Sequence, residues 1–255
     1  MYFNLRHEKI LELAKAEERV LVDDLAARFE VTPQTIRKDL NDLCGQRLLT
    51  RIHGGAEFPS GVDNFEYEDR RQIAALEKTA IGKAAAALIP NESSLFINIG
   101  TTTEAVSEAL LDHSGLMAIT NNINVANRLR VYPKFEVVMA GGVVRSTDGG
   151  IVGETAVDFI RQFKVDFAVI GASAIDPDGA LLDFDIREVK VAQAIIENAR
   201  NVILVADSTK FERAAPVRIA HISQVNTFVT DVCVNKNIRN VCDENDVRLI
   251  EVGSQ

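Results

Sequence analysis

The sequence predicts an α/β protein in two parts, a short helical region followed by a doubly wound parallel sheet. Residues 1–57 carry apolar side chains at helical spacing, whereas residues 73–255 alternate continuous apolar runs with amphipathic stretches. Between them, residues 58–72 contain Pro59, Gly61 and clustered acids, which is typical of a linker or a docking arm. We therefore expect two domains joined by this segment.

Residues 1–57 predict three helices followed by a hairpin, which is the element order of a winged helix-turn-helix. HEKILELAKAE (7–17) and DDLAARF (23–29) each place apolar side chains on one helical face. LLTRIHGGAE (48–57) alternates apolar and polar residues and has two glycines at its return, as a short hairpin would.

The third helix is predicted for residues 33–43. Thr32 is a favoured N-cap, and Pro33 fits the first helical position because its missing N–H costs no hydrogen bond there. Gly45 ends the helix. Its apolar residues recur on one face, at Ile36, Leu40 and Leu43.

The second region predicts a parallel sheet with helices on both faces. Strands that are apolar throughout suit a sheet covered on both sides, and strand–helix alternation favours parallel strands. The expected strands are residues 94–98, 116–120, 135–140, 166–171, 201–206, 226–230 and 247–252. The expected helices are residues 73–88, 103–112, 123–130, 154–162 and 186–199.

A net charge of −9 argues against a protein that coats nucleic acid or an anionic membrane. Residues 31–53 nevertheless form a small basic island, and residues 31–38 contain no acid. The candidate DNA contacts are the outward positions of helix 33–43, its cap and the hairpin tip: Thr32, Gln34, Thr35, Arg37, Lys38, Asn41, Arg51 and His53. Gln and Asn can bond an adenine edge, and Arg can bond guanine. The alternative is a helical bundle that contacts proteins.

Double-stranded DNA is the partner that this face predicts. One such domain makes few base contacts, so a useful affinity requires a dimer, and we expect a homodimer or a homotetramer.

The stretch INIGTTTEA (97–105) predicts a site for an anion. A glycine after a strand permits close backbone approach, and the first N–H groups of the following helix can bind phosphate. A plain helix cap is the alternative, but it would need one threonine and not three. Other polar residues follow other strands, and ligands of such sheets bind at these strand ends. The candidate phosphate-ligand residues are Gly100, Thr101, Thr102, Thr103, Asn121, Asn122, Gly141, Gly142, Arg145, Glu188, Asp207 and Lys210.

Several classes of function are not supported by the sequence. No stretch has the ~18 to 20 apolar residues of a membrane helix, and the charged N-terminus does not resemble a signal peptide. The odd number of cysteines, Cys44, Cys233 and Cys242, lacks CxxC spacing, which favours reduced thiols in a cytoplasm. We expect no metal and no cofactor.

VTPQTIRKDLNDLCGQRLLTRIHGGA (31–56) closely resembles the N-terminal signature of the DeoR family of bacterial transcriptional repressors. The resemblance continues to about Asp231, through NNINVAN, AGG…RSTDGGIVGE, LLDFDIREVK and ADSTKF, and is strongest to members that control glycerol 3-phosphate metabolism. It implies a second domain with the fold of ribose-5-phosphate isomerase, which senses a phosphorylated sugar or polyol and so releases the repressor from its operator.

A fold shared with an enzyme leaves two readings, a sensor or a sugar-phosphate isomerase. The isomerases resembled here carry Asp-Gly-Ala-Asp-Glu at the turn that matches IGASA (170–174), and proton transfer needs such a base. Ile170, Ser173 and Ala174 cannot serve, although Glu188 lies near the place of another isomerase acid. We therefore expect a sensor and no catalytic residue. A repressor of the same family that answers to another sugar phosphate is a further alternative.

Overall fold

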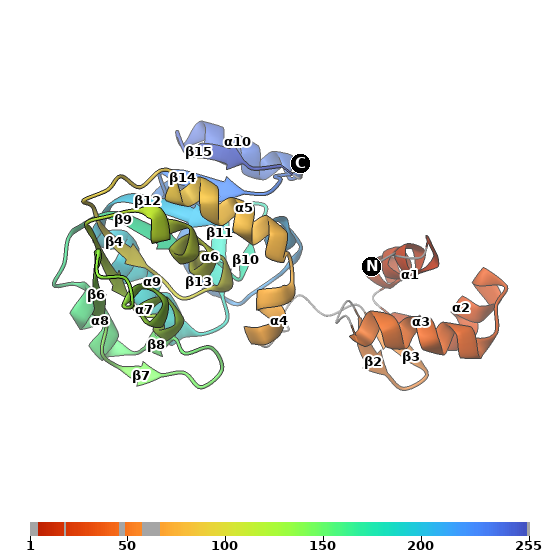
Figure 1. Ribbon diagram of the computed structural model, residues 1–255. Helices are drawn as coiled ribbons and strands as arrows, with labels where there is room; N and C mark the ends of the chain where they lie inside the picture. The colour runs from red at the N-terminus through yellow and green to blue at the C-terminus, as the bar shows by residue number, and fades with distance from the viewer. Residues whose placement is uncertain (1–4, 18, 46–48, 58–66, 254–255) are drawn as a thin grey trace. The chain divides into compact units, whose positions relative to one another are not determined.

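Figure 1 shows the computed structural model, which describes residues 5–17, 19–45, 49–57 and 67–253. The chain divides into two compact units, Met1–Asp63 and Asn64–Gln255.

The first unit consists of three helices and a small antiparallel sheet with strand order β1-β3-β2. Its elements are α1 (Leu5–Glu17), β1 (Arg19–Leu21), α2 (Val22–Phe29), α3 (Pro33–Gly45), β2 (Thr50–Ile52) and β3 (Gly55–Glu57). The three predicted helices and the hairpin are confirmed. Strand β1 was not predicted, because three residues are too few to show a period of two.

The predicted apolar face of α3 forms the centre of this unit. Ile36, Leu40 and Leu43 are fully buried, and they pack with residues of α1 and α2. Gly55 allows β3 to approach β1, since a Cβ there would lie 2.1 Å from the carbonyl oxygen of Val20. The core and this close approach fix the hairpin against the helices.

The second unit is built on a parallel sheet with strand order β15-β14-β12-β9-β4-β5-β6. The strands are β4 (Ser94–Ile97), β5 (Leu116–Thr120), β6 (Phe135–Met139), β9 (Val165–Ile170), β12 (Ala199–Val205), β14 (Thr227–Thr230) and β15 (Arg248–Glu251). All seven predicted strands are therefore confirmed, with ends that differ by at most two residues from the predicted ones.

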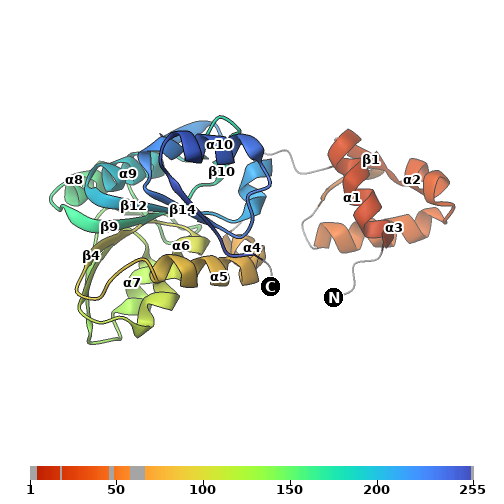
Figure 2. The same ribbon diagram turned by 90° about the horizontal axis from the view of Figure 1, so that it is seen from above.

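Helices cover both faces of this sheet, as the doubly wound prediction requires (Figure 2). One face packs against α5 (Ala75–Ala86), α6 (Thr101–Ala109) and α7 (Ile123–Leu129). The other packs against α8 (Glu154–Ile160), α9 (Ile186–Glu197) and α10 (Lys236–Glu244). Successive residues of β4 serve opposite faces, which explains why the strands read as continuously apolar.

Several short elements were not predicted. They are α4 (Tyr67–Gln72), the hairpin of β7 (Val143–Val144) and β8 (Ile151–Val152), the antiparallel sheet of β10 (Ala174–Ile175), β11 (Ala180–Asp183) and β13 (Val217–His221), and the 3-10 turns η2 (Ser208–Glu212) and η3 (Ile222–Gln224). The last three residues of the predicted helix 103–112 form the 3-10 turn η1 (Leu110–Asp112). Helix α4 lies in the segment predicted as a linker or docking arm. No helix in the described part of the chain is long and apolar enough to cross a membrane.

Candidate functional site

The predicted DNA contacts lie on one solvent-facing side of α3 and on the tip of the β2–β3 hairpin. Gln34, Arg37, Lys38 and Asn41 of the helix are exposed, and so are Thr32, Arg51 and His53, whereas Thr35 is half-buried. The hydroxyl of Thr32 accepts a hydrogen bond from the backbone N–H of Thr35 (3.2 Å), which is the predicted cap.

The one acid in the middle of α3, Asp39, points away from this face. It is buried and accepts hydrogen bonds from Arg6 Nε (2.6 Å) and from His7 Nε2 (3.2 Å) when that nitrogen carries the proton. Burial acts to raise the pKa of Asp39, but the bonds from Arg6 and His7 outweigh it and hold that pKa below its usual value. Asp39 therefore adds no negative charge to the outer face of α3, where Arg37 and Lys38 are exposed together with one acid, Asp42.

A cavity lies in the second unit where the direction of the strand order reverses. Strand β4 lies beside β9; the chain after β4 continues to β5 and β6, and the chain after β9 continues to β12 and β14. Such a reversal opens a crevice at the carboxyl ends of the strands. The cavity is lined by Arg70, Ile99, Gly100, Thr101, Thr102, Thr103, Gly171, Ala172, Ser173, Asp183, Glu188, Val205 and Lys210.

The predicted cradle forms one wall of this cavity, at the start of α6. Gly100 has a φ of 146°, which a residue with a Cβ rarely adopts. The first intrahelical bond runs from Glu104 N to Gly100 O (3.0 Å), and the N–H groups of a helix's first turn have no intrahelical partner. The hydroxyl of Thr103 donates to backbone carbonyls and so shapes the turn, whereas Thr102 Oγ1 makes no hydrogen bond to a described residue.

Four cations gather beside this wall. Burial, together with the nearby charges of Arg213, Lys78 and Arg70, lowers the pKa of Lys210 to about 8, against the opposing effect of Asp207. Burial likewise lowers the pKa of Lys78. The charges with the largest effect on Lys210 thus include three cations and one carboxylate. This end of the cavity carries more positive than negative charge.

The lining of the cavity also includes two carboxylates, Asp183 and Glu188, which are called its carboxylate end below. Asp183 accepts a hydrogen bond from Ser173 Oγ (2.8 Å), and Glu188 lies 2.5 Å from Arg145 Nη2. Burial and the charge of Asp183 raise the pKa of Glu188 to about 8, although Arg145 opposes them. The turn 170–174 lacks the isomerase acids, as predicted, but Asp183 brings a carboxylate to the same place from β11.

Arg145 supports this end from outside the lining. It pairs with Asp148 (2.6 Å) and Asp185 (3.3 Å) as well as with Glu188. Burial acts to lower the pKa of Arg145, but these carboxylates outweigh it and raise that pKa above its usual value. Arg145 therefore holds the carboxylate of Glu188 in position.

The remaining predicted residues of this site are absent from the cavity lining. Asn122 caps α7 by accepting a hydrogen bond from Asn124 N (2.9 Å) and donates to Glu104 Oε1 (3.0 Å), while Asn121 donates to Ile151 O (3.1 Å). Asp207 accepts hydrogen bonds from Thr209. Gly141 and Gly142 form the turn between β6 and β7.

Sequence reasoning missed Arg70, Ser173 and Asp183, which line the cavity, and the neighbouring cations Lys78 and Arg213. Arg70 was missed because the composition of residues 58–72 predicts a linker or a docking arm. A signal existed in the two arginines and amphipathic pattern of EYEDRRQ (66–72). The described part of the chain holds no group of three His, Cys, Asp or Glu side chains that could bind a metal ion.

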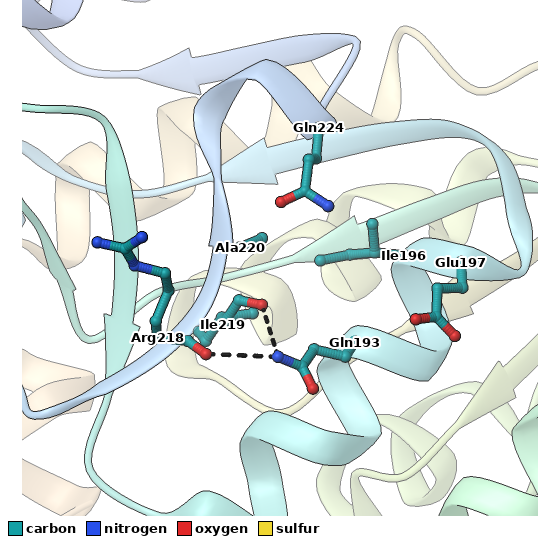
Figure 3. Close-up of a pocket in the computed structure, with 7 residues that line it drawn as sticks. All are labelled: Gln193, Ile196, Glu197, Arg218, Ile219, Ala220 and Gln224. Carbon is teal, nitrogen blue, oxygen red and sulfur yellow. Dashed lines mark hydrogen bonds between the residues drawn. The ribbon is translucent and has the colours of Figure 1, made fainter.

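A second hollow lies between α9 and β13 (Figure 3). Gln193 Nε2 donates to the carbonyl oxygens of Ile219 (3.1 Å) and Arg218 (3.4 Å), as the dashed lines mark. Strand β13 is the outer strand of its small sheet, so these bonds occupy carbonyls that would otherwise be free to pair with another chain. This hollow therefore protects a sheet edge.

Known protein families match both units. The model of the DeoR-like helix-turn-helix domain matches residues 6–62, and that of the DeoR C terminal sensor domain matches residues 73–232. The chain is 48% identical to the glycerol-3-phosphate regulon repressor of Escherichia coli (strain K12), covering 96% of this chain and 97% of that one. It is 40% identical to the HTH-type transcriptional repressor CsqR of the same organism, covering 97% and 95%. Among solved structures it resembles ribose 5 phosphate isomerase A from Neisseria gonorrhoeae (14% identity, 52% of each chain, TM-score 0.39).

A helix-turn-helix unit followed by a sensor domain defines the class of the protein, a transcriptional regulator that binds DNA. The chain belongs to the DeoR family. Its relatives are transcriptional repressors, which decides between sensor and isomerase in favour of the sensor. We therefore look for a function of the carboxylates Asp183 and Glu188 in ligand binding and not in catalysis.

Proposed function

We propose that the protein is a cytoplasmic repressor that a phosphorylated polyol, glycerol 3-phosphate, releases from its operator. Residues 1–57 bind DNA as part of a homodimer or homotetramer, and residues 73–255 bind the effector. Residues 58–72 connect the two activities. The choice of glycerol 3-phosphate is supported by the name of the 48% identical relative.

The observation that carries this proposal is the excess of cations at the start of α6, of which Lys78 and Lys210 are buried and Arg70 and Arg213 half-buried. Arg70 and Lys210 line the cavity with the cradle, and Lys78 and Arg213 lower the pKa of Lys210 from nearby. Buried cations are costly without counter-charge, so an anion at this place would stabilise all of them together. A phosphate would also accept hydrogen bonds from the backbone N–H groups of the first turn of α6.

The carboxylate end supports a ligand with hydroxyl groups. Asp183, Ser173 and Glu188 offer acceptors and donors that could bind the hydroxyls of a polyol. Asp183 already accepts hydrogen bonds from Ser173 Oγ and from Phe184 N (2.7 Å), so it is held in place for such a contact. A phosphate at one end and hydroxyls at the other describe a phosphorylated polyol or sugar.

On DNA, the exposed side chains of α3 would read base edges in the major groove, and Arg51 and His53 would contact the backbone or the minor groove. Binding of the effector and binding of the operator must then weaken each other. An effector that prefers the arrangement with low DNA affinity weakens operator binding by the same factor by which DNA weakens effector binding.

A thermal-shift panel tests the effector. Glycerol 3-phosphate should raise the melting temperature of the full chain, while glycerol and inorganic phosphate at the same concentration should raise it less, since each fills one end of the cavity. A shift with a hexose or tagatose phosphate and none with glycerol 3-phosphate would favour the second candidate, a repressor of the same family with another effector. The 40% identical repressor CsqR has a name that specifies no effector, so family membership alone does not select glycerol 3-phosphate. Turnover of a sugar phosphate that is lost in Glu188→Gln would contradict both.

A further inference from the structure

Arg70 is the residue through which α4 reaches the cavity. Its side chain lines the cavity with Thr101 and Lys210, and its Nη2 donates to Asp148 Oδ2 (3.1 Å). Helix α4 is the first described element of the second unit, so Arg70 lies close in sequence to the segment that leads to the DNA-binding unit. Arg70 therefore lines the cavity and lies a few residues from the boundary between the two units.

The bond between Arg70 and Asp148 can be broken at low cost. Arg145 already holds Asp148 by two bonds, from Nε (2.9 Å) and Nη2 (2.6 Å), and Gly150 N donates a third (3.1 Å). Asp148 would therefore stay paired if Arg70 left. Arg70 Nε is buried and has no hydrogen-bond partner among the described residues. A phosphate could accept from Nε and Nη2 together, which is the stronger geometry for an arginine.

The backbone of Arg70 is bonded to the same site. Its carbonyl oxygen accepts hydrogen bonds from Thr101 Oγ1 (3.3 Å) and from Lys78 Nζ, and Lys78 Nζ also donates to Ile73 O (2.6 Å). One turn earlier, Tyr67 OH donates to Glu104 Oε2 (2.7 Å). The hydrogen bonds of α4 thus end on the first turn of α6 and on a cation of the phosphate end.

We propose that Arg70 exchanges Asp148 for the phosphate of the effector, and that this exchange shifts α4 and so lowers the affinity of the DNA-binding unit for its operator. The proposal rests on the proposed function and adds the element that carries the signal. In the ligand-free protein the Arg70–Asp148 bond holds α4 in the arrangement that binds DNA. Loss of that bond, by ligand or by substitution, releases it.

The test compares operator binding of ligand-free wild type and Arg70→Gln, with a duplex selected by the wild-type protein. Arg70→Gln should bind this duplex at least about fivefold more weakly without any ligand, the lower end of ordinary allosteric coupling. Arg130→Gln is the matched control, because Arg130 is an exposed arginine whose Nε bonds Asn127, and it should bind as wild type does. Circular dichroism and melting temperature establish that both variants are folded.

Adding glycerol 3-phosphate separates this proposal from the proposed function. Saturating glycerol 3-phosphate should weaken the operator binding of wild type and of Arg130→Gln, yet change that of Arg70→Gln by less than about twofold. Ligand-free Arg70→Gln that binds the operator as tightly as wild type overturns the role of Arg70, whichever effector the protein takes. A wild-type protein that does not respond to glycerol 3-phosphate overturns the choice of effector, while the ligand-free comparison still decides on Arg70.

Discussion

The outer face of α3 and the cavity of the second unit place their polar residues in different ways. On α3, the helical period places Gln34, Arg37, Lys38 and Asn41 on the side that faces solvent, so these side chains are not part of the core. At the strand ends of the second unit, several predicted polar side chains bond to other parts of the protein. Asn122, for example, is used as a helix cap. The helical period therefore predicts which side chains of α3 face solvent, whereas residue type alone does not predict the partner of a polar side chain at a buried strand end.

The largest expected effect comes from the cavity. Lys210→Met should weaken glycerol 3-phosphate binding roughly 30- to 1,000-fold, because it removes one partner of a buried charge pair. The same substitution should raise the melting temperature of the ligand-free protein, since burial disfavours the charged form of Lys210. Calorimetric titration and thermal melts measure the two changes. Unchanged effector affinity would remove Lys210 from the site.

The face of α3 should give the next largest effect. Arg37→Ala should weaken operator binding about 5- to 150-fold, which corresponds to the loss of one base contact. Its effector-induced thermal shift should not change. Arg28→Ala is the matched control, because Arg28 of α2 is exposed and pairs with Glu17 (3.1 Å). Gel-shift titrations in which both variants bind equally well would reject the assigned face.

The pH dependence of effector binding sharpens the description of the cavity. Lys210, with its pKa at about 8, is charged at pH 7 and largely neutral at pH 9, and Glu188, also at about 8, gains negative charge over the same range. Both changes disfavour an anion, so affinity for glycerol 3-phosphate should fall about tenfold between pH 7 and pH 9. Lys210→Arg stays charged throughout and should flatten this dependence. Constant wild-type affinity would contradict the lowered pKa.

The smallest effect tests a residue that the sequence assigned to the effector. Asn122→Ala should lower the free energy of unfolding by about 1 kcal/mol, because α7 loses its cap. Effector affinity should change less than in Lys210→Met. Denaturant unfolding and calorimetry measure the pair of values. If Asn122→Ala had normal stability but no longer bound the effector, Asn122 would be a ligand contact after all.

The sequence was sufficient to predict the large sheet because each of its strands is an unbroken apolar run. It did not predict α10, which has only three apolar residues, Ile238, Val241 and Cys242, among nine. The strands β10 and β11 have two and four residues, too few for a period to be recognised. Their absence from the prediction also hid Asp183, which β11 carries into the cavity.

Within the cavity, the cradle at Gly100–Thr103 was predictable because strand, glycine and helix start are consecutive in the sequence. Arg70 and Ser173 were not, because the chain brings them to the cradle from elsewhere. Lys210 was predicted from its position after β12, and there the rule that ligands bind at strand ends was sufficient. Local patterns predicted the local parts of the site, and the tertiary contacts supplied the rest.

The most direct test of the account is the operator affinity of the full chain with and without saturating glycerol 3-phosphate. The account predicts that the effector raises the dissociation constant for operator DNA about 5- to 150-fold, the usual range for coupling between two sites. Equal dissociation constants in the presence and absence of a ligand that demonstrably binds would contradict it.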